Sequence, residues 1–131
     1  MRIISPVDHL AEAAGLIDAG ADELYGGFVP PQWREDSNLL ASLNQRTFSE
    51  AQIATEKELA EIITRAHDRG RSFALTLNAP FYSEEQLPLL LGYLDRMVTL
   101  GIDGLILADP GMIHLLAGRY PTLELHASTM A

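Results

Sequence analysis

The chain has 131 residues, of which 47% are hydrophobic and 21% are charged, as expected for one globular domain. Eighteen acidic against nine basic residues give a net charge of −9, the opposite of the basic footprint of nucleic-acid-binding proteins. The absence of cysteine excludes disulfides, thiolate nucleophiles and cysteine-ligated clusters within the chain. Since no apolar stretch is long enough for a membrane helix or a signal peptide, we expect a cytoplasmic protein without membrane contacts.

Four segments carry apolar residues at the helical spacing i, i+3, i+4, i+7, and each predicts an amphipathic helix. They cover residues 10–17, 59–66, 87–94 and 113–120. Thr55 and Ser83 each stand three residues before a glutamate or glutamine, which predicts capping boxes, and Asp109-Pro110 is typical of a helix start. Four glycines predict where the helices end: Gly20, Gly70, Gly101 and Gly118.

Short strand-like runs lie between the predicted helices, at residues 2–5, 23–26, 72–78, 104–109 and 123–128. Strict alternation of strand and helix predicts parallel strands joined by right-handed crossovers. In the third and fifth runs, one set of alternate side chains is apolar and the other is small or polar, which favours a barrel over a sheet covered on both faces. A complete barrel of this type has eight strands and about 250 residues. The sequence therefore predicts an α/β fold, an incomplete parallel β/α (TIM-like) barrel of about five strands and four helices.

We expect residues 1–131 to form a single partial-barrel domain with a long loop at about residues 27–49. Ligands of parallel β/α folds bind at the carboxyl ends of the strands and in the loops that follow them. Within the loop, Arg46 is the best candidate for an anion contact, because its planar fork suits carboxylate or phosphate. The substrate-binding candidates are Tyr25, Asn44, Arg46, Asn78, Tyr82 and Thr129.

His126, Ser128 and Asp109 are the catalytic candidates. Side chains two residues apart on a strand share one face but lie about 6.5 to 7 Å apart, which is long for a nucleophile and its base. There is no G-x-S-x-G elbow, and Asp109 is equally suited to cap a helix, so a serine triad, a binding role and a structural role all stay open. No metal site is predicted, because the histidines lack ligand spacing; a metal held by Asp109 and His126 is the alternative.

Six segments resemble the U32 peptidase family in order and spacing over almost the whole chain. They are Ile4-Ser5-Pro6, residues 19–27, residues 75–78, residues 101–106, Asp109-Pro110-Gly111 and His126-Ala127-Ser128-Thr129. The last of these, His-Ala-Ser-Thr after a Pro-x-hydrophobic strand, is the most specific. The resemblance implies an incomplete barrel whose remaining strands lie beyond Ala131.

The resemblance leaves three functions open. The first is a segment of a peptidase or hydrolase, acting on a peptide or a small molecule. The second is a segment of an iron–sulfur-dependent, oxygen-independent hydroxylase of RNA bases or of a quinone precursor. Its cluster would be held by cysteines downstream of this chain, so no cofactor is expected within the chain. The third is a non-catalytic ligand-binding or scaffold module.

The isolated chain is expected to be inactive, because barrel sites draw residues from strand ends around the whole ring. Whether the parent protein is an enzyme stays open. We expect no nucleic-acid binding by this segment alone. Self-association is expected, because five strands leave two open sheet edges.

Overall fold

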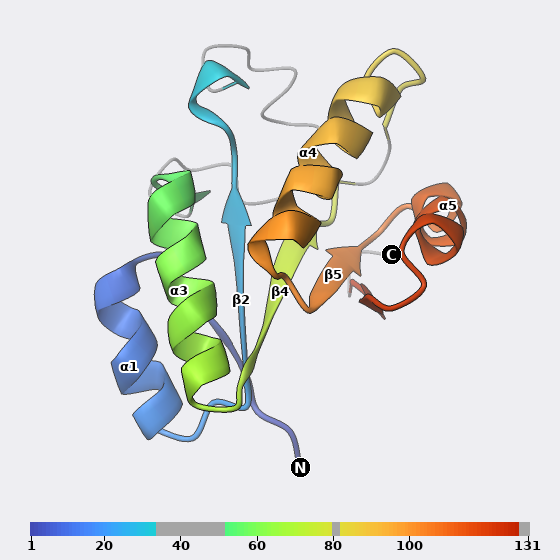
Figure 1. Cartoon of the computed structure of the whole chain (residues 1–131). Coiled ribbons are helices and arrows are strands. Elements are labelled where there is room, and N and C mark those ends of the chain that lie inside the picture. Colours follow the sequence, from blue (N-terminus) through green and yellow to red (C-terminus); the bar gives the residue numbers. More distant parts are fainter. Residues whose placement is uncertain (34–51, 80–81, 129–131) are drawn as a thin grey trace.

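A computed structural model describes residues 1–33, 52–79 and 82–128 (Figure 1). Its strands are β1 (Ile4–Pro6), β2 (Glu23–Phe28), β3 (Gln52–Ile53), β4 (Ser72–Leu77), β5 (Gly104–Leu107) and β6 (Glu124–Ala127). Its helices are α1 (Leu10–Asp18), α3 (Glu56–Asp68), α4 (Leu87–Leu100) and α5 (Pro110–Arg119), with a 3-10 turn η1 at Pro31–Trp33. No helix within these residues is long and apolar enough to cross a bilayer.

The strands form one parallel sheet in the order β1-β2-β4-β5-β6. This arrangement confirms the predicted alternation of parallel strands and helices. The sequence did not predict β3, which pairs with the end of β2 through Gln52 and Ile53. Two residues are too few to show the period of a strand, so only the pairing with β2 defines β3.

Helices α1, α3 and α4 lie on the same side of the strands in Figure 1. The strand side chains that form the core are Leu24, Phe73, Leu75, Leu77, Leu105 and Leu107, all fully buried. Since side chains alternate along a strand, Tyr25, Thr76 and His126 belong to the opposite face. One face of the sheet is therefore apolar. The other carries mainly small or polar side chains, as the sequence predicted for a barrel wall, although Ile106 lies between Thr76 and His126 in the register.

The predicted carboxyl ends of the helices hold with one exception. Glycines in the left-handed region, with φ of 112°, 67° and 103°, follow α1, α3 and α4 at Gly20, Gly70 and Gly101. The prediction for Gly118 is wrong, because α5 continues through it to Arg119. The backbone N–H of Tyr120 still donates to the Leu116 carbonyl at 2.8 Å, so this helix needs no left-handed residue to end.

Of the two predicted capping boxes, the one at Thr55 marks the start of its helix, whereas the one at Ser83 lies one turn too early, since α4 begins at Leu87. Thr55 caps α3, since its hydroxyl accepts from the backbone N–H of Glu58 at 3.0 Å. Ser83 and Gln86 form the reciprocal pair of a capping box, with distances of 2.9 and 3.3 Å. That pair stabilises the turn that immediately precedes α4.

Candidate functional site

Asp109 links β5 to α5 and acts as the N-cap of that helix. Its Oδ1 accepts hydrogen bonds from the backbone N–H groups of Gly111 at 2.8 Å and Met112 at 3.3 Å. Pro110 occupies the first turn, where its missing N–H costs nothing. Of the roles that the sequence left open for Asp109, the structure shows the helix cap.

Tyr82 and Asp109 are brought together at the carboxyl ends of β4 and β5. Both line a cavity of about 380 Å³ that also includes Leu87 and Met112, from the first turns of α4 and α5. The Tyr82 hydroxyl donates to the Leu77 carbonyl at 2.9 Å. Burial raises the pKa of Tyr82 above its usual value near 10, so the phenol remains a neutral hydrogen-bond donor.

The other predicted binding residues lie on or just after the strands, or outside the described residues. Tyr25 stands within β2, half-buried and paired in register with Ala74. Asn78 directly follows β4 and is also half-buried. Asn44, Arg46 and Thr129 lie outside the described residues, as does most of the predicted loop. Convergence of these side chains on one pocket stays a prediction.

Ser128 follows β6, and its backbone N–H donates to the Leu107 carbonyl at 2.6 Å, which extends the pairing with β5. The ring of His126 lies beside the carboxylates of Glu23 and Glu124. Its Nε2 is 3.6 Å from Oε1 of Glu23 and 3.4 Å from Oε1 of Glu124. The structure therefore gives the three catalytic candidates different surroundings: a helix cap, a strand end and a cluster of carboxylates.

Glu23 and Glu124 are the first residues of β2 and β6, so this cluster lies at the amino ends of the strands. Oε2 of Glu23 accepts from Arg2 Nη2 and from Ser72 Oγ, both at 2.6 Å. Arg2 Nη1 donates to Oε1 of Glu124 at 3.0 Å. We call Arg2, Glu23, Ser72, Glu124 and His126 the amino-end cluster.

Electrostatics within the amino-end cluster favour the charged form of Arg2. The hydrogen bond to Glu124 and the charge of Glu23 raise the pKa of Arg2. Glu23 has a side chain only 1% exposed, which is rare for a carboxylate unless it is paired. The sequence did not predict this cluster, although Glu23, Ser72 and Glu124 are each the first residue of a strand.

Gly104 allows β5 and β6 to approach closely. A Cβ atom at Gly104 would lie 2.8 Å from the Glu124 carbonyl oxygen, which is too short, and 3.5 Å from Nε2 of His126, which is an ordinary contact. Gly104 begins β5, between β4 and β6. The His126 ring packs beside Gly104, and its Nε2 approaches Glu23 of β2 on the same face of the sheet.

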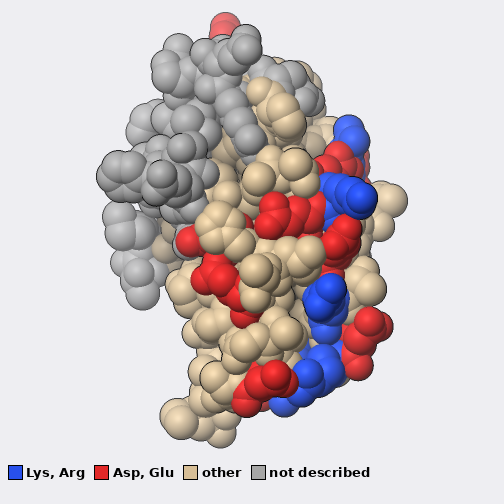
Figure 2. Space-filling model, turned by 90° about the vertical axis from the view of Figure 1, so that its left-hand side faces the viewer, with Lys and Arg blue, Asp and Glu red and all other residues tan. Residues whose placement is uncertain are grey.

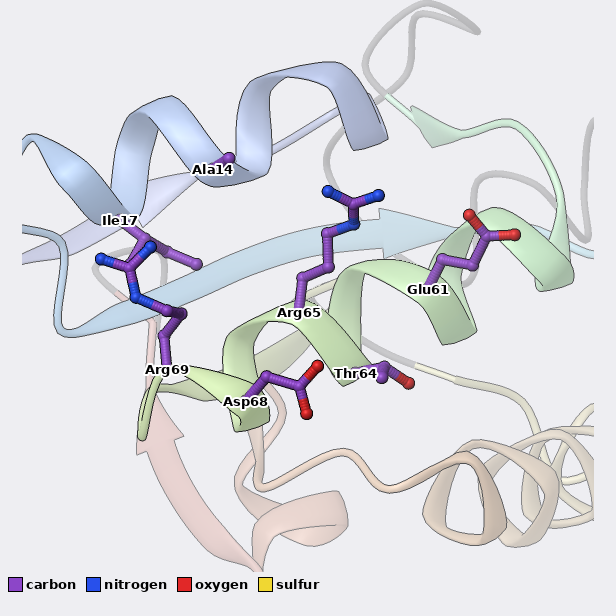
Figure 3. A pocket seen from close by; sticks show the side chains of 7 residues that line it. All are labelled: Ala14, Ile17, Glu61, Thr64, Arg65, Asp68 and Arg69. Atoms are coloured by element: carbon purple, nitrogen blue, oxygen red, sulfur yellow. The ribbon is translucent and has the colours of Figure 1, made fainter.

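A second cavity, of about 480 Å³, lies between α1 and α3 on the helical side of the molecule (Figure 3). Arg65 and Arg69 reach into it from α3, and Arg69 pairs with Asp18 of α1 at 3.0 Å. The surface in Figure 2 interleaves acidic with basic side chains and shows no basic patch. That this segment alone binds no nucleic acid stays a prediction.

An iron–sulfur cluster does not fit the residues present. Such clusters are held by cysteine thiolates, and the chain has no cysteine. The nitrogen and oxygen donors of the amino-end cluster are not an equivalent ligand set. We therefore assign no cluster ligand to this chain.

Curated relatives match nearly the whole chain. It is 33% identical to the tRNA hydroxylation protein P of Helicobacter pylori, over 100% of this chain and 28% of the relative. It is 32% identical to the 23S rRNA 5-hydroxycytidine C2501 synthase of Escherichia coli, over 98% of this chain and 17% of the relative. The chain thus spans less than a third of the length of these relatives.

The solved structure of the U32 peptidase Mk0906 matches 100% of this chain and 50% of its own chain, with a TM-score of 0.70. At 21% identity, this match shows a common fold. The model of Peptidase family U32 matches residues 8–131. The chain therefore belongs to the U32 peptidase family, and it has the fold of the N-terminal part of that family's barrel.

Proposed function

We propose that this chain is the N-terminal barrel segment of a protein that hydroxylates a base in RNA. The observation that carries the proposal is its similarity, along nearly its whole length, to proteins named for tRNA and rRNA hydroxylation. Among the functions that the sequence left open, this one fits these relatives better than peptide hydrolysis does.

The geometry of the catalytic candidates supports the same choice. Peptide hydrolysis by a serine triad needs a nucleophile, a base and an acid joined by hydrogen bonds. Asp109 instead accepts from two backbone N–H groups, and His126 lies beside Glu23 and Glu124. The peptidase function therefore rests on the family name alone.

The proposed reaction replaces a ring C–H bond of the base by a C–OH bond, which is a two-electron oxidation. The oxygen atom and the acceptor of the two electrons would both come from co-reactants bound outside this chain. This chain has no thiolate to hold an iron–sulfur cluster, so we assign to it no redox step. Its part is to form the wall of the barrel and to contribute groups near the strand ends such as Tyr82, which lines the same cavity as Asp109. Because the chain has a net charge of −9, we expect other parts of the protein to bind the RNA phosphates. A protein that acts on such an RNA is expected in the cytoplasm.

Nucleoside analysis of a deletion strain tests the proposal. The gene that encodes this chain is deleted in its host, tRNA and rRNA are digested, and the nucleosides are compared by mass spectrometry. We expect one nucleoside heavier by one oxygen atom to disappear and to return when the complete gene is restored. A gene that carries Gly92→Ala is the control and should restore the nucleoside equally well. A Cβ at this exposed helical position meets no atom within 4 Å.

Unchanged nucleosides in both RNA classes would contradict the proposal. Hydrolysis of peptides by the complete purified protein would then favour the peptidase function. Ligand binding without turnover in either assay would favour the non-catalytic module.

A further inference from the structure

Two buried polar atoms of the amino-end cluster face each other without a hydrogen bond. They are Oε1 of Glu23 and Nε2 of His126, which lie 3.6 Å apart. The Glu23 side chain is 1% exposed, so water does not replace the missing partner of its carboxylate oxygen. Nearly all buried polar groups in proteins are hydrogen-bonded, and an exception of this kind calls for an explanation.

Glu124 completes a set of three ligand atoms. One carboxylate oxygen from Glu23, one from Glu124 and Nε2 of His126 all lie within 4.8 Å of one another. The two measured separations from Nε2 are 3.4 and 3.6 Å. Ligands about 2.1 Å from a tetrahedral metal ion lie about 3.4 Å apart, so the spacing suits an ion at the centre of the set.

We propose that Glu23, Glu124 and His126 bind a divalent transition-metal ion such as Zn²⁺ at the amino ends of the strands. One imidazole with two carboxylates is a donor set typical of first-row transition metals, whereas Mg²⁺ and Ca²⁺ take oxygen ligands alone. This site goes beyond the proposed RNA hydroxylation, because it lies at the opposite ends of the strands from Tyr82 and Asp109.

The neighbours of the three ligands support a preformed site. Arg2 and Ser72 hold Oε2 of Glu23, so that Oε1 is left pointing at His126. Hydrogen bonds that orient a metal ligand in this way are typical of metal sites. Gly104 allows β6, which carries Glu124 and His126, to lie close to β5, because a Cβ there would be 2.8 Å from the Glu124 carbonyl oxygen.

The charge of the cluster also favours a cation. Two carboxylates and the Arg2 guanidinium leave one net negative charge when the imidazole is neutral. Oε1 of Glu124 already accepts from Arg2, but this side chain is 50% exposed and can turn its other oxygen towards an ion. The competing occupant is a proton on His126, which would make the cluster neutral without any metal.

Metal titration of the full chain distinguishes these occupants. The chain is stripped with a chelator, and its uptake of Zn²⁺ is measured by calorimetry at neutral pH, with Mg²⁺ and Ca²⁺ as comparison ions. Co²⁺ then serves as an optical probe, because its visible absorption reports a low-coordinate site with nitrogen and oxygen ligands. We expect one equivalent of Zn²⁺ or Co²⁺ to bind, and no saturable binding of the other two ions.

Variants assign the ligands. Glu23→Gln, Glu124→Gln and His126→Asn are each expected to weaken Zn²⁺ binding more than tenfold, and Ser72→Ala to weaken it by about tenfold through loss of orientation. His67→Asn is the matched control, because His67 forms a separate, exposed pair with Asp103 at 2.8 Å. The affinity of the His67→Asn variant for Zn²⁺ should equal that of the unchanged chain.

Three results would overturn the proposal: no saturable Zn²⁺ uptake by the folded chain, equal uptake of Mg²⁺, or unchanged affinity in folded Glu23 and His126 variants. Circular dichroism checks that each variant is folded. If the buried Glu23→Gln variant unfolds, the half-exposed Glu124→Gln variant decides, since it removes one ligand at lower structural cost. Retained affinity in that variant would count against the site.

Discussion

The carboxylate of Glu58 in α3 accepts a hydrogen bond at 2.9 Å from the backbone N–H of Leu10, the first residue of α1. The first N–H groups of a helix have no partner within the helix, and the positive end of the helix dipole favours an acidic group there. Glu12 accepts from His9 N–H at 3.0 Å at the same helix start. Helix α1 is thus held by an acid from its own first turn and by one from the neighbouring helix.

Replacing Glu58 with alanine should lower the free energy of unfolding by about 1 kcal/mol, because the Leu10 N–H loses a charged acceptor. Glu85→Ala, at an exposed position in the turn before α4, is the control and should change stability by less than about 0.5 kcal/mol. Urea unfolding followed by circular dichroism measures both. Equal effects of the two substitutions would argue against the cap.

Gly104→Ala should destabilise the chain by about 1 to 3 kcal/mol, because the new Cβ would lie 2.8 Å from the Glu124 carbonyl oxygen and push β6 away. The same substitution at Gly92, in the exposed part of α4, meets nothing within 4 Å and should stabilise the helix by about 0.5 to 1 kcal/mol. Thermal unfolding of the two variants side by side gives the comparison. If Gly104→Ala left the stability unchanged, β5 and β6 could separate at little cost in free energy.

Asp109→Ala should cost about 1 kcal/mol of stability, since two backbone N–H groups of α5 lose their acceptor. Asp109→Ser should recover most of that loss, because a serine hydroxyl also caps helices well. Chemical denaturation of both variants tests the cap. Activity of the complete protein then separates the roles, since a purely structural Asp109 predicts that the serine variant remains active.

Tyr93 makes stability depend on pH on the alkaline side. Its hydroxyl donates to the Phe28 carbonyl at 2.7 Å, and burial raises its pKa well above the usual value near 10. The folded chain therefore keeps this proton at a pH where the unfolded chain releases it. The resulting stability is complete below about pH 10 and is lost as the pH rises further.

Tyr93→Phe should cost about 1 kcal/mol at neutral pH and should make the alkaline loss of stability shallower. Some loss should remain, because burial also raises the pKa of Tyr82. The measurement is the free energy of unfolding in urea between about pH 8 and pH 11. An unchanged slope in the variant would show that Tyr93 does not cause it.

Self-association stays a prediction, and the sheet gives it a specific form. Among the described residues, β1 pairs with β2 alone and β6 with β5 alone, so each has one edge available for another strand. The net charge of −9 opposes contact between two copies, so added salt should promote it by screening. Sedimentation velocity over a range of concentrations tests this, and a strict monomer at high salt would contradict it.

Local signals in the sequence predicted most of the fold. The apolar spacing at residues 59–66 and the Asp109-Pro110 pair each describe a feature that a few neighbouring residues determine. Strand alternation also placed His126 correctly on the polar face. It could not say in which direction along the strand the ring points, because that depends on Gly104 and on Glu23, far away in the sequence.

The amino-end cluster is the part that the sequence could not predict. An acid at the first position of a strand, such as Glu23 or Glu124, usually indicates a solvated strand start. Only the pairing order of β2, β4, β5 and β6 brings these acids to one face, and the partners Arg2 and Ser72 explain how Glu23 can be buried. The pairing order of strands is a long-range property that periodicity within one segment does not contain.

The hydrogen bond from Arg2 to Glu124 joins residues separated by 122 positions. During synthesis on the ribosome, Arg2 and Glu23 leave the exit tunnel before Glu124. The Arg2 guanidinium can therefore pair at first with the Glu23 carboxylate alone. Strands β1, β2, β4 and β5 can pair without β6, but the hydrogen bond from Arg2 to Glu124 can form only after β6 has been made. Of the two carboxylate contacts of Arg2, the one with Glu124 is thus the later to form, and it joins the residues before β1 to β6.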